Sequence, residues 1–166
     1  MEIRVDRGDI TGVAVDAVVT AANRSLAGGG GVDGAIHRAA GPRLITALRT
    51  MAPCPPGQAV VTDAFDMNPP VRWIVHAVGP RYGVDEPAAE LLASTYLSAL
   101  TRCDEVGAAS VAFPSISTGA YNYPLHEACK VSIRALRAAS TGVRTCVLVA
   151  FDLKTERFWL RALTGG

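Results

Sequence analysis

The sequence predicts an α/β protein whose central, largely parallel sheet carries helices on both faces. Short segments rich in valine, isoleucine and aromatic residues alternate along the chain with segments of helical periodicity. Several of the short segments are continuous apolar runs, as expected for parallel strands buried on both faces. The 166 residues are 49% hydrophobic and contain neither a linker-like tract nor an internal repeat. We therefore expect one domain with a sizeable core over residues 1–166.

The first half of the chain is predicted to begin with two strands and two short helices. Strands are expected at residues 3–5 and 16–21, followed by a run of glycines, a short helix, a second helix over residues 43–51 and a strand at 59–63. Gly41 and Pro42 mark the end of the first helix, because glycine favours a helix C-terminus and proline cannot continue a helix.

The second half of the chain repeats the alternation. Strands are expected at residues 71–78, 110–113 and 145–151. Between them, apolar residues recur near helical spacing in two segments, and each set marks one buried stripe of a helix. These residues are Leu92, Tyr96, Leu100 and Cys103 in the first segment, and Leu125, Cys129, Ile133 and Leu136 in the second.

Charge and cysteine usage exclude several classes of function. Sixteen basic and fifteen acidic residues give a formal net charge of +1, without any Lys/Arg run, so the broad basic surface of a nucleic-acid or membrane binder is missing. The N-terminus lacks a basic and apolar leader, and no apolar run approaches the ~20 residues that span a bilayer, so we expect a cytoplasmic protein. The four cysteines lack CxxC spacing; we expect them to be reduced and mostly buried, with no metal site.

Two long loops rich in glycine and serine follow predicted strand ends. Residues 23–33 come after DAVVTAA and contain four consecutive glycines, and residues 114–124 come after SVAF. Ligands of open α/β sheets bind beyond the carboxyl ends of the strands, so we expect the two loops to share a cleft. Backbone N–H groups that no side chain obstructs, next to a helix N-terminus, bind anions without a cation. The two loops together are suited to a diphosphate.

The glycine run does not match the motifs of other common enzyme classes. Gly29, Gly31 and Gly34 satisfy GxGxxG, but no Asp or Glu lies between Asp33 and Asp63 to bind a ribose, which disfavours a nicotinamide-dependent oxidoreductase. The chain also lacks the GxxxxGK[ST] motif of triphosphate hydrolases and the GxSxG motif of serine esterases. The sequence HEACK lacks the second histidine of the zinc-peptidase motif HExxH.

Long motifs that resemble those of a known family extend over nearly the whole chain. The stretch GDITGVAVDAVVTAANRSLAGGGGVDGAIHRAAGP resembles the opening of a macro domain of the MacroD type, and CPPGQAVVTDAF, WIVHAVGP and FPSISTGAYNYPLHEA are similar to its later blocks in the same order. The resemblance implies a three-layer α/β/α sandwich with a mostly parallel, mixed central sheet. It also implies binding of ADP-ribose and metal-free hydrolysis, without a cofactor, of acyl-linked substrates such as O-acetyl-ADP-ribose and ADP-ribosylated Asp or Glu on proteins.

The resemblance further implies three catalytic residues near the distal ribose of ADP-ribose. Asp33 would lie near the anomeric carbon or its ester and orient or activate a water, and a phosphate oxygen of the ligand could help. Asn23 would hold the distal ribose, since an amide both donates to and accepts from hydroxyls. Tyr121 would pack against that sugar.

The remaining residues implied by the resemblance would bind the adenine and the diphosphate. Asp9 would accept a hydrogen bond from the adenine amino group, the backbone of Ile10 would read the ring edge, and Phe151 would stack on the ring. The diphosphate would lie between the two loops, lined by Gly30, Gly31 and Val32 on one side and by Ser117, Thr118, Gly119, Ala120 and Tyr121 on the other.

Several of these residues have a competing structural interpretation. Asp33 is of a preferred type for the N-cap of a helix that starts at Gly34. Phe151 could belong to the core at a strand end, and Asp9 could serve a turn. The two tyrosines of the second loop, Tyr121 and Tyr123, could serve only to anchor that loop and not to bind a ligand. We expect the three histidines to be structural because none lies beside a nucleophile or metal partner in the sequence, namely His37, His76 and His126.

Two positions depart from the family pattern and leave alternative functions open. Thr20 begins TAAN where family members usually have NAAN, and Asn122 stands where glycine is common. Either change could alter which ADP-ribose linkage is cleaved. The alternatives are removal of ADP-ribose from a nucleic acid and a reader that binds ADP-ribose without hydrolysis. The expected partners are small molecules that contain ADP-ribose or ADP-ribosylated macromolecules, not a membrane.

Overall fold

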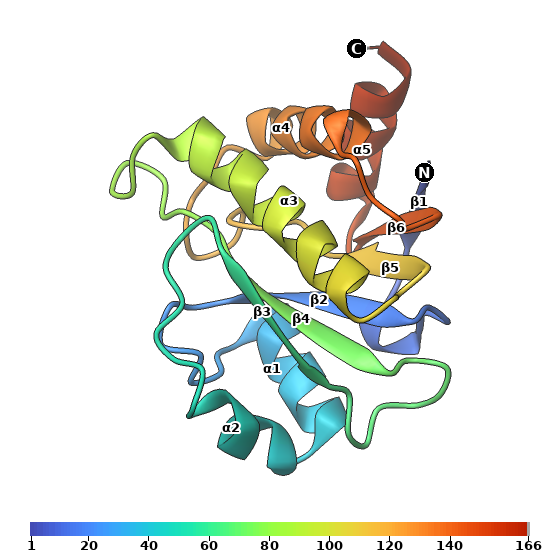
Figure 1. Cartoon of the computed structure of the whole chain (residues 1–166). Coiled ribbons are helices and arrows are strands. Elements are labelled where there is room, and N and C mark those ends of the chain that lie inside the picture. Colours follow the sequence, from blue (N-terminus) through green and yellow to red (C-terminus); the bar gives the residue numbers. More distant parts are fainter. Residues whose placement is uncertain (166) are drawn as a thin grey trace.

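The computed structural model describes residues 1–165 of the chain. Strands and helices alternate along it, as Figure 1 shows. The elements are β1 (Glu2–Arg7), the 3-10 helix η1 (Ile10–Gly12), β2 (Ala17–Ala22), α1 (Gly31–Ala40), α2 (Arg43–Leu48), β3 (Ala59–Asp63), β4 (Trp73–Val78), α3 (Ala88–Glu105), β5 (Ser110–Phe113), α4 (Leu125–Ala138), β6 (Thr145–Ala150) and α5 (Leu153–Gly165).

The strands form one mixed sheet in the order β1-β6-β5-β2-β4-β3. Every neighbouring pair is parallel except β3 and β4, which are antiparallel at one edge. The strand β2 lies between β5 and β4 and is almost entirely buried, as expected for an apolar strand with helices on both sides. The predicted mostly parallel, mixed sheet is therefore confirmed.

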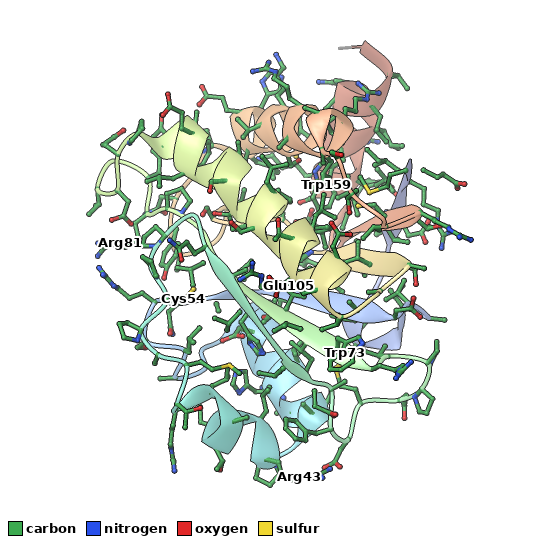
Figure 2. The ribbon with its side chains drawn as sticks, viewed as in Figure 1. Arg43, Cys54, Trp73, Arg81, Glu105 and Trp159 are labelled. Carbon is green, nitrogen blue, oxygen red and sulfur yellow. The ribbon has the colours of Figure 1, made fainter. Side chains whose placement is uncertain are left out.

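Helices cover both faces of the sheet and bury two separate cores. Helices α3, α4 and α5 lie on one face, and α1, α2 and η1 lie on the other (Figure 1). In the first core the indole of Trp159, labelled in Figure 2, is fully buried, and its Nε1 donates to Ser132 Oγ at 3.0 Å. This hydrogen bond satisfies the buried indole N–H and joins α5 to α4. Helices on both faces of one sheet confirm the predicted three-layer sandwich.

The observed boundaries lie close to the predicted ones, with one whole helix missed. The predicted strands at 59–63 and 110–113 agree with β3 and β5, whereas the predicted helix 43–51 ends at Leu48. The helix α5 was not predicted. Its buried face is formed by Thr155, Trp159 and Ala162, a helical spacing that the sequence carries. All four cysteines are buried, as expected. None of the described helices is long and apolar enough to cross a membrane.

Candidate functional site

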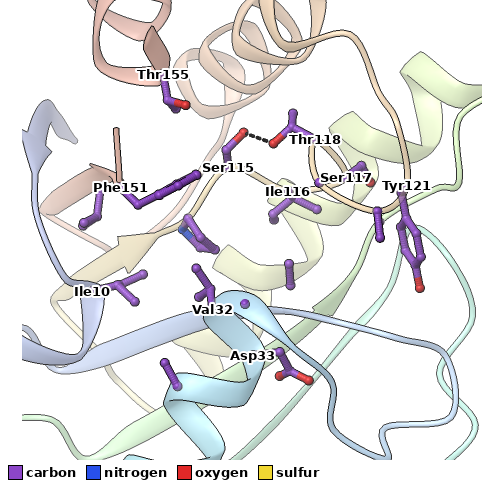
Figure 3. A pocket seen from close by; sticks show the side chains of 18 of the residues that line it. Ile10, Val32, Asp33, Ser115, Ile116, Ser117, Thr118, Tyr121, Phe151 and Thr155 are labelled. Carbon is purple, nitrogen blue, oxygen red and sulfur yellow. Dashed lines mark hydrogen bonds between the residues drawn. The ribbon is translucent and has the colours of Figure 1, made fainter. Parts of the chain in front are cut away.

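A cavity of about 1140 Å³ lies at the carboxyl ends of β2 and β5, shown from close by in Figure 3. These strands are neighbours in the sheet, but they pair only over Ala17↔Val111 and Val18↔Ala112. Beyond these pairs the described parts of the two strands share no ladder, which leaves room between their ends. The loops that follow β2 and β5 line this space, so the predicted shared cleft is present.

The cavity is lined by every residue for which the sequence analysis predicted a catalytic or binding role. Figure 3 shows Ile10 and Phe151 at one end of the cavity and Tyr121 at the other. The predicted residues among those lining the cavity are Asp9, Ile10, Asn23, Gly30, Gly31, Val32, Asp33, Ser117, Thr118, Gly119, Ala120, Tyr121 and Phe151.

Sequence reasoning missed part of the lining because it missed α5. Asp152, Lys154 and Thr155 line the cavity from the start of that helix. The Asp152 carboxylate accepts a hydrogen bond from Thr155 N at 2.8 Å. Hydrogen bonding to Thr155 holds the pKa of Asp152 below its ordinary value. An aspartate just before a segment whose buried residues recur at helical spacing, as Thr155, Trp159 and Ala162 do, is the capping signal that would have found the helix.

The glycine loop presents unpaired backbone amides to the cavity. Helix α1 begins at Gly31, and its N-cap Gly30 makes no side-chain cap. Within residues 1–165, the N–H groups of residues 29–32 donate no hydrogen bond. Residues 31 and 32 lie in the first turn of α1, which has no internal acceptors for its N–H groups, and residues 29 and 30 precede it. Asp33 lies inside this first turn, so its interpretation as the N-cap of a helix starting at Gly34 is wrong.

The second loop offers a similar row of amides from the opposite side. The N–H groups of residues 117–121 make no hydrogen bond to any residue that the structure describes. The backbone of Ser117 is in the left-handed region, at φ +68°, and its carbonyl accepts from Tyr123 N at 2.9 Å. Ser117 Oγ is buried and has no partner among the described residues. The hydroxyls of Ser115 and Thr118 bond each other at 2.8 Å (Figure 3).

The two tyrosines of this loop differ in position. Tyr123 is buried and packs against Tyr82, with ring centroids 4.8 Å apart, so it anchors the loop. Tyr121 is half-buried and lines the cavity, while its carbonyl accepts a hydrogen bond from Tyr82 N at 2.9 Å. The anchoring interpretation therefore applies to Tyr123, and the ring of Tyr121 is available to a ligand.

Asp33 is a buried carboxylate at the floor of the cavity. Only 6% of the residue is exposed. Its Oδ1 accepts a hydrogen bond from Thr20 Oγ1 at 2.8 Å and lies 3.6 Å from His37 Nε2. Burial raises the pKa of Asp33 above its ordinary value, whereas the Thr20 hydroxyl and then the His37 ring oppose that rise. Asp33 therefore takes up a proton at a higher pH than an exposed aspartate does.

Asn23 stabilises the glycine loop in addition to lining the cavity. Its Nδ2 donates to Gly28 O at 2.9 Å, and its Oδ1 accepts from Ser25 Oγ at 2.8 Å. An amide nitrogen carries two hydrogens. The second hydrogen of Nδ2 makes no hydrogen bond within residues 1–165 and remains for a ligand.

Phe151 and Asp9 lie at the other end of the cavity. Phe151 is 75% exposed, so its interpretation as a core residue is wrong. Asp9 Oδ1 accepts from Thr11 N at 2.9 Å and Thr11 Oγ1 at 2.7 Å, which caps η1 and lowers the pKa of Asp9. Asp9 thus stabilises the turn that begins η1, which agrees with its structural interpretation. Its Oδ2 makes no hydrogen bond within the described chain.

The fold places two histidines, His37 and His76, close to Asp33. One ring nitrogen of His37, one of His76 and a carboxylate oxygen of Asp33 all lie within 4.8 Å of one another. His76 is fully buried, and burial lowers its pKa to about 3. In space, His37 and His76 therefore lie beside a carboxylate, and their structural role stays a prediction. His126 instead stacks on Phe158, with centroids 5.3 Å apart.

Comparison with known proteins identifies the family of this chain. The family model for the Macro domain matches residues 19–132, more than half of the chain. The chain belongs to the macro domain family. An O-acetyl-ADP-ribose deacetylase of Citrobacter rodentium is 45% identical to this macro domain, over 98% of this chain and 95% of the relative.

Solved macro domain structures share the fold over nearly the whole chain. A glycine-to-valine mutant of the Oceanobacillus iheyensis macrodomain with ADPR has a TM-score of 0.91 and 37% identity, and the match covers 97% of this chain and 91% of that one. The Trypanosoma brucei macrodomain in complex with ADP-ribose has a TM-score of 0.87 and 33% identity, covering 97% and 68% respectively.

Proposed function

We propose that this macro domain is a hydrolase that binds ADP-ribose and releases it from acyl-linked substrates. One observation carries the proposal: two rows of unpaired backbone N–H groups, at residues 29–32 and 117–121, line the same cavity as the buried carboxylate of Asp33. The relative named O-acetyl-ADP-ribose deacetylase and the macrodomain solved in complex with ADP-ribose support it. The substrates are O-acetyl-ADP-ribose and proteins ADP-ribosylated on Asp or Glu.

The diphosphate docks between the two loops. Free amides at the start of α1 and in the second loop donate to its oxygens, and the positive end of the helix dipole faces the same anion. No lysine or arginine is needed, because oriented amides bind phosphate without a cation.

The cavity orients the two ends of the nucleotide differently. The exposed ring of Phe151 stacks on adenine, and the free Oδ2 of Asp9 accepts from the adenine amino group. At the other end, Asn23 holds the distal ribose with its remaining Nδ2 hydrogen, and Tyr121 packs against the sugar. This arrangement presents the acyl linkage to Asp33.

Asp33 acts as the general base of the reaction. Its carboxylate takes a proton from a water that attacks the acyl-linked ribose, and the products are ADP-ribose and the free carboxylic acid. Burial raises the pKa of Asp33 and so brings it closer to the pH at which the enzyme works, which favours a base. The base must be ionised, so turnover rises with pH through that raised pKa.

The proposed activity is tested by presenting three modified substrates side by side, in the presence of a chelator. We expect release of ADP-ribose from O-acetyl-ADP-ribose and from a protein modified on glutamate, measured by mass spectrometry, with no loss of rate in the chelator. Micromolar binding of ADP-ribose by calorimetry without release from any substrate would show a reader instead. Release only from ADP-ribosylated DNA would show the nucleic-acid alternative.

Thr20 influences the reaction through Asp33 and not by touching the ligand. Its side chain is fully buried and is absent from the described lining of the cavity, and its hydroxyl donates to Asp33 Oδ1. The hydroxyl stabilises the ionised carboxylate, because a hydrogen bond to a charged acceptor contributes more than one to a neutral acceptor.

We expect Thr20→Val to shift the acid limb of the kcat profile to higher pH. Removing the donor removes a contact that lowers the pKa of Asp33, so a larger share of the carboxyl is protonated at neutral pH. We expect kcat at neutral pH to fall about ten-fold while KM changes little. Thr20→Ser keeps the hydroxyl and should restore both the rate and the pH profile. An unchanged pH profile in Thr20→Val would contradict this role.

A further inference from the structure

The side chains of Asp33, His37 and His76, called here the buried triad, converge behind the cavity floor. Asp33 and His37 are four residues apart on α1, so both lie on the same face of that helix. His76 reaches them from β4, where it pairs in register with Thr20 of β2. Their ligand atoms lie within 4.8 Å of one another, and the Asp33 Oδ1 to His37 Nε2 distance is 3.6 Å.

His76 keeps one ring nitrogen without a partner inside this cluster. Thr62 Oγ1 lies 3.0 Å from both Asp63 O and His76 Nε2. When the hydroxyl gives its single proton to Asp63 O, it accepts from the ring N–H of His76. The proton of the neutral imidazole is thereby placed on Nε2. Nδ1 carries a bare lone pair, is buried, and has no hydrogen-bond partner within residues 1–165. A buried acceptor without a partner is costly for a structural histidine.

The same features that are unfavourable for packing are those of a metal ligand. A neutral imidazole with one nitrogen free and the other hydrogen-bonded is the state in which histidine binds metals, and the bond from the second nitrogen fixes the ring. Thr62 supplies that bond here. Asp33 adds one anionic oxygen, and His37 adds a second imidazole.

We propose that the buried triad binds a Zn²⁺ ion through Asp33, His37 and His76, and that this ion inhibits the hydrolase. Two imidazoles and a carboxylate match the ligand preferences of Zn²⁺, at bond lengths of about 2.0–2.2 Å. Tetrahedral ligands at those lengths lie roughly 3.3 Å apart. The Asp33–His37 pair is already near this value, and the ligand atom of His76, which lies within 4.8 Å of the other two, must move closer to complete the site. His37 is part exposed, which provides the path of entry.

Zinc at this position competes with catalysis because it takes the lone pairs of Asp33. A carboxylate bound to zinc no longer accepts a proton from water, so turnover stops while the diphosphate loops stay free. The inhibitory consequence rests on the proposed function, but the metal site does not. Metal binding is measurable in a protein without any substrate.

The direct test is titration of the chelator-treated, full-length protein with Zn²⁺ by calorimetry and with Co²⁺ by absorption spectroscopy. We expect one ion per chain and a visible Co²⁺ spectrum of nitrogen and oxygen ligands without a thiolate band. His37→Gln, at a part-exposed position, should weaken binding about ten-fold or more. His126→Gln is the matched control, because His126 lies outside the triad against Phe158, and it should bind like the wild type.

Each result has a defined meaning for the site. Three results would overturn the zinc proposal. These are equal zinc affinity in His37→Gln and the wild type, a thiolate band from one of the buried cysteines, and the absence of saturable binding. His76→Gln should also lose the ion, and its circular dichroism shows whether it folds. If it does not fold, His37→Gln and the Co²⁺ spectrum decide the question alone.

Activity then separates the two proposals. We expect Zn²⁺ to abolish release of ADP-ribose in the wild type, an excess of chelator to restore it, and His37→Gln to require about ten-fold more zinc or more. Zinc binding in a protein without hydrolysis would uphold the site and refute the proposed function. Hydrolysis that persists or increases with the triad occupied would refute the inhibition.

Discussion

Asp33→Ala is expected to lower turnover by about 10²- to 10⁴-fold, the usual contribution of a positioned general base, while ADP-ribose affinity stays within a few-fold. The affinity is retained because the diphosphate is held by the amides of residues 29–32 and 117–121 rather than by this carboxylate. Single-turnover kinetics with O-acetyl-ADP-ribose and calorimetry with ADP-ribose measure the two quantities separately. Turnover that is unchanged in the variant would refute the catalytic role.

Two further variants make the Asp33 experiment specific. Asp33→Asn keeps the shape of the side chain and should lose turnover as fully as the alanine variant. Asp66→Asn removes a carboxylate that pairs with Arg43 at the exposed end of α2, and turnover should not change. A loss of turnover in the Asp66 control would attribute the effect to net charge rather than to Asp33.

The raised pKa of Asp33 also sets a stability that depends on pH. A carboxyl whose pKa is higher in the folded state binds more protons there than in the unfolded chain, so its contribution to folding falls as pH rises from 3.8 through the raised value. Asp33→Asn removes the ionisation, so its free energy of unfolding should exceed that of the wild type at neutral pH. The difference should shrink in acid. A buried charge retained against stability is typical of an active site.

Gly34→Ala should reduce ADP-ribose affinity about ten-fold or more by displacing the glycine loop. A Cβ at Gly34 would stand 2.7 Å from the carbonyl oxygen of Gly29 and 3.2 Å from Arg38 Nη1. Backbone cannot rotate away as a side chain can, so the loop moves and its amides lose their alignment with the diphosphate. Overpacking of this kind costs about 1–3 kcal/mol, which for a chain of this size is a fall in Tm of roughly 2–12 °C.

Gly12→Ala provides the matched control for this substitution. Its Cβ would meet no atom within 4 Å, and Gly12 does not line the described cavity. Affinity and Tm should therefore stay near the wild-type values. Calorimetry with ADP-ribose and differential scanning fluorimetry measure both variants. Wild-type affinity in Gly34→Ala would mean that the loop does not need its present position against α1.

Sequence reasoning worked best where a local pattern has only one physical outcome. Short apolar runs such as residues 110–113 favour buried strands, and four glycines before a helix remove the side chains that would cover its N-terminus. It failed where the outcome depends on neighbours. Asp33 has the chemistry of an N-cap, but α1 begins at Gly31, three residues before the predicted start, and Gly30 takes the cap position. Phe151 has the composition of a core residue but follows the last strand at the open end of the sheet.

The sequence by itself determined the α/β class, the macro domain motifs and the two loops that line the cavity. Periodicity, glycine content and the alternation of strands and helices along the chain are local properties. Only the tertiary structure decided which side chains surround Asp33. Thr20, His37 and His76 come from β2, α1 and β4, and the sheet and one helix turn bring them together. The Thr20 hydroxyl and the His37 ring both lower the pKa of Asp33 against the effect of burial. Helical spacing places His37 beside Asp33, whereas only the pairing of strands brings Thr20 and His76 there, because spacing along the sequence does not encode contacts between separate elements.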